Sequence, residues 1–324
     1  MSYAQGNLRA RMVLRVRRIV TSSSGSVPGM AKPDFVRKAG AGLGALALAA
    51  LWFVLPGAAA ASNELSFGVF PQLSTRAMVE TYQPLVDYLN ESTRRPANLE
   101  SAKDFHTFHT RTMAGEYDLV LTAPHLAWLA WKEGGYRPIL VYKTPAKGFI
   151  VTRTDSPHRR LADLRGATIA TPDPLAIINI RLERDLMAAG LSLDGDVKLI
   201  AVGTHTNAAT HVSEKRTDAA IVGVFPFLGL PKEVRDGLRV IANTPDMPGH
   251  VFLVHPDMPV AQERAIGKAI EKFMLGESGA VFLKKTGFGG VRALKRNELQ
   301  QVEGDAREFK RRYQAQTESV ERPQ

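Results

Sequence analysis

The chain has 324 residues, of which 44% are hydrophobic and 23% charged, and its 42 Lys and Arg against 32 Asp and Glu give a formal charge of +10. Eight of the basic residues and one acid fall within the first 61 residues, so residues 62–324 hold 34 basic and 31 acidic residues, a net charge of +3. This composition excludes disorder over most of the chain and a duplex-binding basic face, and the absence of Cys excludes disulfides, thiolate metal sites and a lipidated cysteine.

Residues 30–61 have the pattern of a secretory signal peptide. Three basic residues, Lys32, Arg37 and Lys38, precede an uncharged apolar stretch over 39–55, and small residues follow at 58–61. We predict cleavage near Ala61 and a periplasmic location, with an uncleaved membrane anchor as the alternative. Residues 1–29 are interpreted as a disordered extension that results from an over-long start assignment.

Apolar periodicity predicts strands and helices in alternation through residues 64–122. Strands are predicted over 64–70, 97–101 and 117–122, and helices over 75–90 and 105–114. Pro84 falls inside the first helix, so a kink or a late helix start is expected there.

The same alternation restarts after residue 146. The later predicted strands cover 147–152, 167–171, 198–202, 218–224, 239–242 and 251–254. The later predicted helices cover 160–164, 176–189, 207–213, 262–275, 278–285 and 298–314. Two such blocks predict an α/β fold with two lobes, each an open and mostly parallel sheet flanked by helices.

Strand and helices after residue 245 need a sheet to pack on, which predicts a discontinuous first lobe. We assign residues 62–145 and 246–324 to lobe 1 and residues 146–245 to lobe 2. The chain then crosses between lobes near 142–147 and returns near 243–249, and two crossings form a hinge. Ligands of open α/β sheets bind at the carboxyl ends of strands, so a ligand is expected in the cleft between the lobes.

Polar side chains follow several predicted strands and are candidates for ligand contacts. Thr122 and His125 come after the strand over 117–122, and Asn179 lies at the start of the next long helix. Thr204 and His205 stand where exposed main-chain amides at a helix start favour an anion. The alternative is that these residues only cap strands and helices.

The histidines give no metal site. His106 and His109 are three residues apart and could share a helix face, but no carboxylate continues that spacing. His250 and His255 flank a predicted strand and are interpreted as surface residues. We therefore predict no metal and no cofactor.

Motifs for catalysis are missing from the sequence. It contains no G-x-S-x-G, P-loop or H-E-x-x-H pattern. Glu183 and Asp185 are interpreted as a solvated helix face. We predict that the protein is not an enzyme.

Four segments behind the signal peptide carry a family resemblance. They are DFHTFHTRTMAGEYDLVLTAPHLAWLA, LADLRGATIATPDP, GTHTNAATHVSEKRTDAAIVG and FLKKTGFGGV. In this order they resemble the phosphonate/phosphite/phosphate-type family of periplasmic substrate-binding proteins. The resemblance implies a type II periplasmic-binding-protein fold that closes on a solute and delivers it to an ABC permease without chemistry.

The resemblance also implies positions for ligand contacts. Phe105 stands where the family usually has a ligand-facing tyrosine, Thr122 and Ala123 match its strand-end contact, and His205 matches its histidine. Residues 176–179 depart from the family, because Ala-Ile-Ile-Asn replaces a Ser-Thr-Ser-Gly run that holds the phosphonate oxygens. Each missing charge-assisted hydrogen bond is worth about 1.5–3 kcal/mol, so a less charged, partly apolar ligand competes with phosphonate.

These observations predict a periplasmic solute-binding component of an ABC importer that binds a small phosphorus-containing or organic anion, acts as a monomer and binds no nucleic acid. The alternative is a ligand-sensing partner of a membrane sensor kinase. The predicted ligand contacts are Phe105, Thr122, His125, Ile177, Asn179, Thr204 and His205.

Overall fold

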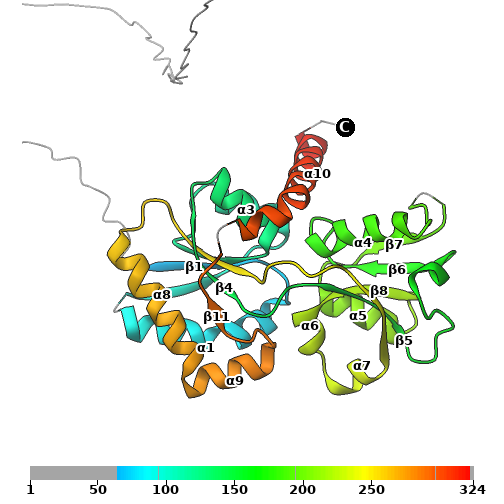
Figure 1. Cartoon of the computed structure of the whole chain (residues 1–324), viewed down its shortest axis with the longest axis horizontal. Coiled ribbons are helices and arrows are strands. Elements are labelled where there is room, and N and C mark those ends of the chain that lie inside the picture. The colour runs from blue at the N-terminus through cyan, green and yellow to red at the C-terminus, as the bar shows by residue number, and fades with distance from the viewer. Residues whose placement is uncertain (1–63, 94, 194, 296, 322–324) are drawn as a thin grey trace, which may run out of the picture. The chain divides into compact units, whose positions relative to one another are not determined.

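A computed structural model describes residues 64–93, 95–193, 195–295 and 297–321. The predicted signal peptide and the extension before it lie outside these residues. The described part has two lobes, each built from one sheet and its helices (Figure 1). The predicted two-lobed α/β fold is confirmed. No helix within the described ranges has the length and apolar content needed to cross a bilayer.

Lobe 1 contains a six-stranded sheet in the order β11-β4-β10-β3-β1-β2. Its first part comprises β1 (Leu65–Val69), α1 (Thr75–Thr93), β2 (Ala97–Glu100), α2 (Phe105–Met113), β3 (Leu119–Thr122), α3 (Pro124–Lys132) and β4 (Arg137–Tyr142). Its second part comprises β10 (Val251–Val254), α8 (Val260–Leu275), α9 (Glu277–Thr286), β11 (Val291–Arg292), the 3-10 helix η2 (Glu298–Val302) and α10 (Glu303–Glu321).

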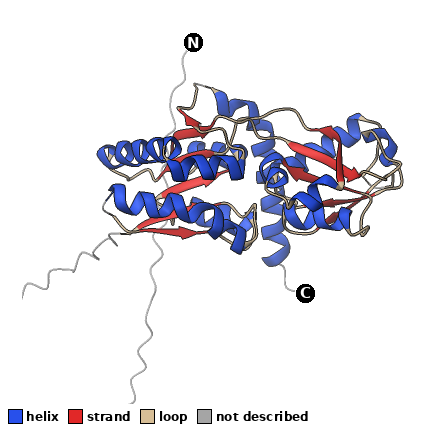
Figure 2. Cartoon of the chain, turned by 90° about the horizontal axis from the view of Figure 1, so that it is seen from below, coloured by secondary structure: helices blue, strands red, loops and turns tan. Residues whose placement is uncertain are grey.

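Lobe 2 contains a five-stranded sheet in the order β7-β6-β8-β5-β9. Its elements are β5 (Gly148–Arg153), η1 (Leu161–Leu164), β6 (Thr168–Thr171), α4 (Ile177–Ala188), β7 (Lys198–Ala201), α5 (His205–Ser213), β8 (Ala219–Gly223), α6 (Val224–Leu228), α7 (Lys232–Asp236) and β9 (Leu238–Asn243). Helices cover the sheets of both lobes (Figure 2). Every residue of β3, β8 and β10 is therefore buried, as their near-continuous apolar sequences predict.

Both sheets are mixed, although a mostly parallel arrangement was expected. β1 pairs in parallel with β2 and β3, and β6 pairs in parallel with β7 and β8. β10 runs antiparallel to β3 and β4, and β5 runs antiparallel to β8 and β9. Parallel neighbours need a crossover connection, usually a helix, whereas β5 and β10 enter their lobes directly from the connecting segments.

Several elements differ from the sequence-based expectation. The helix α3 and the strand β4 were not predicted, and the predicted helix over 298–314 is a 3-10 turn followed by the longer helix α10. Pro84 neither ends nor delays α1, which begins at Thr75 and continues to Thr93. Pro84 lies on the exposed side of α1.

The two connecting segments pair with each other between the lobes. Ala146 and Met247 exchange two main-chain hydrogen bonds of 3.0 Å, and the Tyr142 amide donates to the His250 carbonyl at 3.0 Å. Gly249 lies so close to the Tyr142 carbonyl that a Cβ atom would collide with it. The crossings thus fall in the predicted segments, while the exact lobe boundaries at 145/146 and 245/246 stay predictions.

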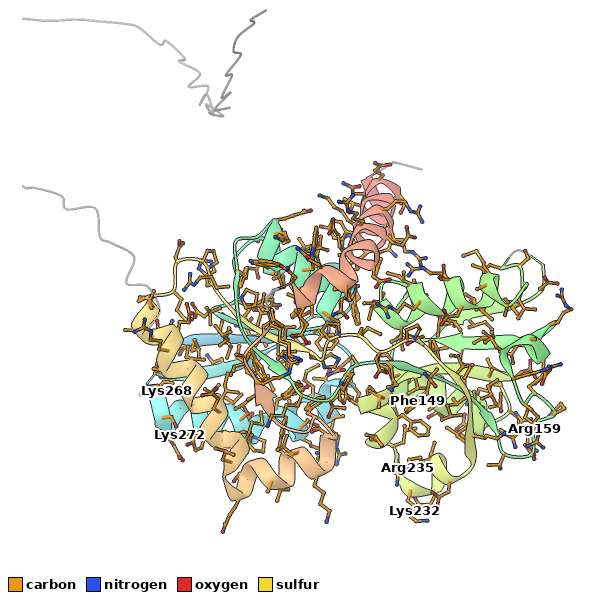
Figure 3. The ribbon with its side chains drawn as sticks, viewed as in Figure 1. Phe149, Arg159, Lys232, Arg235, Lys268 and Lys272 are labelled. Atoms are coloured by element: carbon orange, nitrogen blue, oxygen red, sulfur yellow. The ribbon has the colours of Figure 1, made fainter. Side chains whose placement is uncertain are left out.

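Basic side chains are distributed over both lobes. Lys268 and Lys272 lie on α8 of lobe 1, whereas Lys232 and Arg235 lie on α7 of lobe 2 (Figure 3). These labelled cations therefore do not form one continuous basic face.

Two helical glycines provide a matched test of packing in lobe 1. Gly279 in α9 contacts the Phe273 carbonyl so closely that a Cβ has no room, whereas nothing lies within 4 Å of a Cβ at Gly267 in α8. We expect Gly279→Ala to lower the free energy of unfolding by about 1–3 kcal/mol through overpacking. Gly267→Ala should raise it by about 0.5–1 kcal/mol because alanine has the higher helix propensity. Urea unfolding of both variants measures the difference, and equal effects would contradict the packing described for α9.

Candidate functional site

A small cavity lies between the lobes, and we call it the histidine cavity. Its lining comprises Phe70, Gln72, Phe105, Ala123, Pro124 and His250 from lobe 1, Ala146 and Lys147 from the first connecting segment, and Ala176, Ile177, Ile178, His205, Gly223, Val224, Phe225 and Pro226 from lobe 2. The cavity volume is about 30 Å³. A single water needs about 10–15 Å³, so the lobes are closed with little space between them.

His205 projects from the first turn of α5 into this cavity. Thr204 caps the helix by accepting a 3.1 Å hydrogen bond from the Asn207 amide. The Nδ1 atom of His205 accepts a hydrogen bond of 3.2 Å from the Gly223 amide, which places the ring proton on Nε2. Nε2–H has no hydrogen-bond partner among the described residues, so it is free to donate a hydrogen bond. Burial lowers the pKa of His205 to about 4, and the ring is neutral at pH 7.

His250 is a second neutral imidazole at the cavity. Its ring meets those of Phe70 and Phe225 edge-on, each at 4.8 Å between centroids. Burial lowers its pKa to about 3, and Nδ1 has no hydrogen-bond partner in the described part of the chain. The interpretation of His250 as a surface residue was wrong. β10 is antiparallel to β3, with Val251 opposite Thr122, so the start of β10 lies at the carboxyl end of β3, where the cleft is.

The start of α4 presents apolar side chains to the cavity. Ala176 is the N-cap residue and makes no side-chain capping bond, and Ile177 and Ile178 are buried. Asn179 instead donates to the Glu183 carboxylate at 3.2 Å and to the Pro174 carbonyl at 3.4 Å. The only hydrogen-bond donors that this helix start can offer a ligand are therefore its main-chain amides.

The cavity lining also lacks an unpaired cation. Lys147 lines it, and its Nζ atom lies 2.5 Å from Asp246 Oδ1. No arginine belongs to the lining formed by the described residues. With both histidines neutral, a ligand in this cavity meets an almost uncharged surface.

The seven predicted contact residues divide into two groups. Phe105, Ile177 and His205 line the histidine cavity, whereas Thr122, His125, Asn179 and Thr204 do not. Their roles as ligand contacts stay predictions. Gln72, Phe225 and His250 also line the cavity but were not among the predicted contacts. Gln72 and Phe225 both follow predicted strands and could be found from that pattern, whereas the antiparallel pairing of β10 was the missing signal for His250.

His125 connects the lobes from within their interface. It is fully buried, and Nε2 donates a 3.2 Å hydrogen bond to the Leu175 carbonyl of lobe 2. Its ring also meets Phe309 of α10 edge-on at 5.3 Å. Burial lowers the pKa of His125 to about 3, so this contact is made by a neutral ring.

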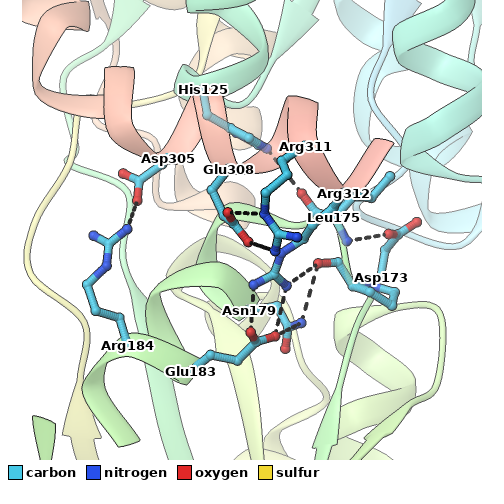
Figure 4. A network of polar contacts seen from close by, with 11 residues as sticks. His125, Asp173, Leu175, Asn179, Glu183, Arg184, Asp305, Glu308, Arg311 and Arg312 are labelled. Atoms are coloured by element: carbon cyan, nitrogen blue, oxygen red, sulfur yellow. Dashed lines mark hydrogen bonds and ion pairs between the residues drawn. The ribbon is translucent and has the colours of Figure 1, made fainter. Parts of the chain in front are cut away.

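An ion pair between α10 and α4 joins the two lobes near the cavity. Arg181 of α4 donates to Asp305 Oδ2 from Nη2 at 2.8 Å and from Nε at 3.1 Å, and it also donates to the Pro245 carbonyl. The side chains are only 10% and 3% exposed. Arg184 of α4 reaches the other oxygen of Asp305 at 3.1 Å (Figure 4).

A second ionic cluster lies along the same two helices. Arg312 of α10 donates to both oxygens of Glu183 at 2.8 and 2.6 Å and to Glu308 at 2.7 Å (Figure 4). Hydrogen bonds from Arg311 and Arg312 lower the pKa of Glu308 to about 2. The interpretation of Glu183 as a solvated residue was wrong, because its partner lies 129 residues away and no local pattern reveals it.

No group of three or more His, Asp and Glu side chains suited to a metal occurs in residues 64–321 as far as they are described. His106 stacks on Tyr313 at 4.3 Å between ring centroids, and His109 meets Phe309 edge-on at 5.0 Å. Both histidines therefore pack against α10.

Comparison with known proteins identifies the class. The family model described as the periplasmic substrate-binding protein of the phosphonate ABC transporter matches residues 67–299. The chain therefore belongs to this family of ABC-transporter binding proteins, which indicates a periplasmic location and a transport role rather than catalysis. No curated protein matches.

Solved structures share the fold at low sequence identity. A binding protein component of an ABC phosphonate transporter from Pseudomonas aeruginosa matches with a TM-score of 0.68 at 15% identity, over 78% of this chain and 87% of that one. PhnD1 from Prochlorococcus marinus, in complex with methylphosphonate, gives a TM-score of 0.68 at 12% identity, over 77% and 99%. XAC2383 from Xanthomonas citri, bound to chloride ion, gives 0.62 at 21% identity, over 78% and 100%. None of these matches supports the alternative of a sensor-kinase partner.

Removal of the buried carboxylate should weaken closure. We expect Asp305→Asn to lower the free energy of unfolding by about 3–5 kcal/mol, because Arg181 would keep its charge in a buried place without a counter-charge. Small-angle scattering should show a larger radius of gyration as the lobes separate. Glu303→Gln is the control, since its partner Arg307 is 73% exposed and such a pair contributes at most about 1 kcal/mol. An Asp305→Asn loss no larger than that of the control would contradict the role of this pair.

Acid should destabilise the closed fold through its buried histidines. Burial lowers the pKa of His125 and His250 to about 3 and of His109 and His205 to about 4, whereas an unfolded histidine titrates near about 6.5. Below pH 6.5 these histidines bind more protons in the unfolded chain than in the folded one. Their contribution to the free energy of unfolding is therefore fully present above pH 6.5 and is lost as the pH drops toward 4 and 3. The slope is up to about 1.4 kcal/mol per pH unit for each histidine. Urea unfolding between pH 7 and 4.5 measures this slope. His205→Gln should lower the slope by the contribution of about one proton. A free energy of unfolding that did not change with pH would contradict the burial of these rings.

Proposed function

We propose that this protein is the substrate-binding component of an ABC importer whose lobes close around a small organic solute carrying at most one negative charge. The observation that carries the proposal is the neutral lining of the histidine cavity. The role includes delivery to an ABC permease, action as a monomer, cleavage of the signal peptide near Ala61, and no chemistry on the solute.

Charge balance favours an organic solute over a phosphorus-containing one. A doubly charged oxyanion that leaves water needs several charge-assisted hydrogen bonds, each worth about 1.5–3 kcal/mol. The described side chains around the histidine cavity offer the Nε2–H of neutral His205 and the single N–H of neutral His250, while Lys147 is held by Asp246. The amides at the start of α4 add a partial positive charge, which suits a single negative charge better than two.

Apolar contacts support the same conclusion. Phe70 and Phe105 form an edge-on pair at 5.8 Å between ring centroids, and Ile177 and Ile178 face the same cavity from lobe 2. Such surfaces stabilise an apolar ligand by about 25 cal/mol per Å² removed from water, and they offer nothing to oxyanion lone pairs.

Restoring hydroxyl groups at the start of α4 tests the proposal. We expect the variant Ala176→Ser, Ile177→Thr, Ile178→Ser to bind methylphosphonate at least about 100-fold more tightly than the unchanged protein, since two or three new hydrogen bonds would meet the oxyanion. Isothermal titration with methylphosphonate, phosphite and phosphate measures this difference, and circular dichroism checks that the variant is folded.

The control is the apolar variant Ile177→Val, Ile178→Val, which shortens both side chains without adding a donor and should leave phosphonate binding weak. If the unchanged protein bound methylphosphonate as tightly as the hydroxyl variant, the neutral lining would not decide the ligand and the proposal would be wrong. Mass spectrometry of solutes released from protein purified out of the periplasm would show directly whether an organic solute is bound.

A further inference from the structure

A second and larger cavity opens beside the histidine cavity, and we call it the lysine cavity. Its volume is about 170 Å³, against about 30 Å³ for its neighbour. Residues of α1, α9 and adjoining loops of lobe 1 form one side, and residues of α5 and α6 of lobe 2 form the other. Gln72, Phe225 and Pro226 line both cavities, so the two cavities adjoin.

The lysine cavity is complete only when the lobes are closed. The ring of Phe225 from lobe 2 lies 4.4 Å from that of Phe288 from lobe 1. At its rim, a Cβ atom on Gly287 would lie 2.6 Å from Leu228 of α6, so the lobes are in direct contact there. A ligand held in this cavity would therefore favour closure, as a substrate of a two-lobed binding protein must.

One cationic side chain stands at the cavity. Lys285, in the last turn of α9, donates a 3.2 Å hydrogen bond from Nζ to the main-chain oxygen of Glu80. Its Nζ has no carboxylate within 4.0 Å among the described residues. Glu80 also lines the cavity; its carboxylate binds Arg76 at 2.7 Å, and the charge of Lys285 contributes to the lowered pKa of Glu80. Lys285 therefore keeps donors for one anionic group.

Uncharged polar groups face the same space. Gln72 and Thr81 are 3% and 5% exposed, and neither the Gln72 Oε1 atom nor the Thr81 hydroxyl has a hydrogen-bond partner in the described part of the protein. The amide nitrogen of Gln72 donates to the Tyr82 hydroxyl at 3.2 Å, which fixes the orientation of the side chain. Neither atom is fully buried, so both are accessible to a polar group of a ligand in this cavity.

The rest of the lining is mostly apolar, apart from Glu80, Thr206 and Thr286, and it is large enough for a ring. Leu73, Ala77, Tyr82, Phe225 and Phe288 contribute most of it. A cavity of about 150 Å³ lined by apolar side chains holds a benzene molecule, so the lysine cavity has the size of one aromatic ring. The histidine cavity, at about 30 Å³, does not.

We propose that the lysine cavity is the compartment of the cleft that binds an aromatic monocarboxylate, with the ring against Tyr82, Phe225 and Phe288 and the carboxylate on Lys285. This inference rests on the proposed function, since it names the class of organic solute that the closing lobes enclose. One cation accounts for a single negative charge, and the open oxygen of Gln72 and hydroxyl of Thr81 bind further polar substituents on the ring.

Isothermal titration with phenylacetate and its neutral analogue phenylacetamide tests this site. Phenylacetate should bind at least tenfold more tightly than phenylacetamide. Lys285→Met should weaken phenylacetate binding at least tenfold and leave phenylacetamide binding within twofold. Lys284→Met is the matched control, because it removes the same charge one residue away, outside the cavity lining, and should change neither affinity by more than twofold.

His205→Ala separates this inference from the proposed function. A larger loss of phenylacetate affinity in Lys285→Met than in His205→Ala places the carboxylate in the lysine cavity and supports the inference. If His205→Ala abolished phenylacetate binding and Lys285→Met left the affinity unchanged, the inference would be overturned and the proposed function would stand. Absence of phenylacetate binding at millimolar concentration would overturn it as well, while the methylphosphonate titrations decide the proposed function independently.

Discussion

A carboxylate buried between two helices of different lobes holds the described structure in its closed form. Asp305 of α10 accepts hydrogen bonds from Arg181 and Arg184 of α4, and Arg181 also holds the Pro245 carbonyl in the second connecting segment. A buried carboxylate is costly unless it is paired, so α10 cannot leave α4 without a large loss. The C-terminal helix therefore links lobe 2 to lobe 1 independently of the two connecting segments.

The neutrality of the site follows from this closure. With the lobes together, His205 and His250 are removed from water and their pKa values fall to about 4 and about 3. Burial is the largest cause of both shifts, and no carboxylate of the described residues counteracts it at either ring. Burial at the cavity thus keeps both imidazoles uncharged at pH 7.

Local patterns in the sequence predicted most elements but few of their partners. Alternating and continuous apolar runs predicted the bounds of β1, β3, β6 and β8 to within a few residues. This was possible because the apolar pattern of a strand reflects the burial of that strand. The role of His250 was not predictable in this way, since it depends on β10 running antiparallel to β3. The Glu183–Arg312 pair likewise joins residues 129 positions apart in the chain. In the sequence, neither residue can be distinguished from an exposed charged residue of a helix.

The sequence by itself determined the two-lobed α/β class through its apolar periodicity and the family through the order of its motifs. It also determined the loss of hydroxyl groups at 176–178, because residue identities are read directly from the sequence. The sequence also pointed to Phe105, Ile177 and His205. Only the tertiary structure showed that His250 joins them at the cavity and that Thr122, His125, Asn179 and Thr204 do not line it, since this depends on how separate segments meet after both lobes have folded. It also decided the charge of the site, because the pKa of a histidine depends on how much water its surroundings exclude.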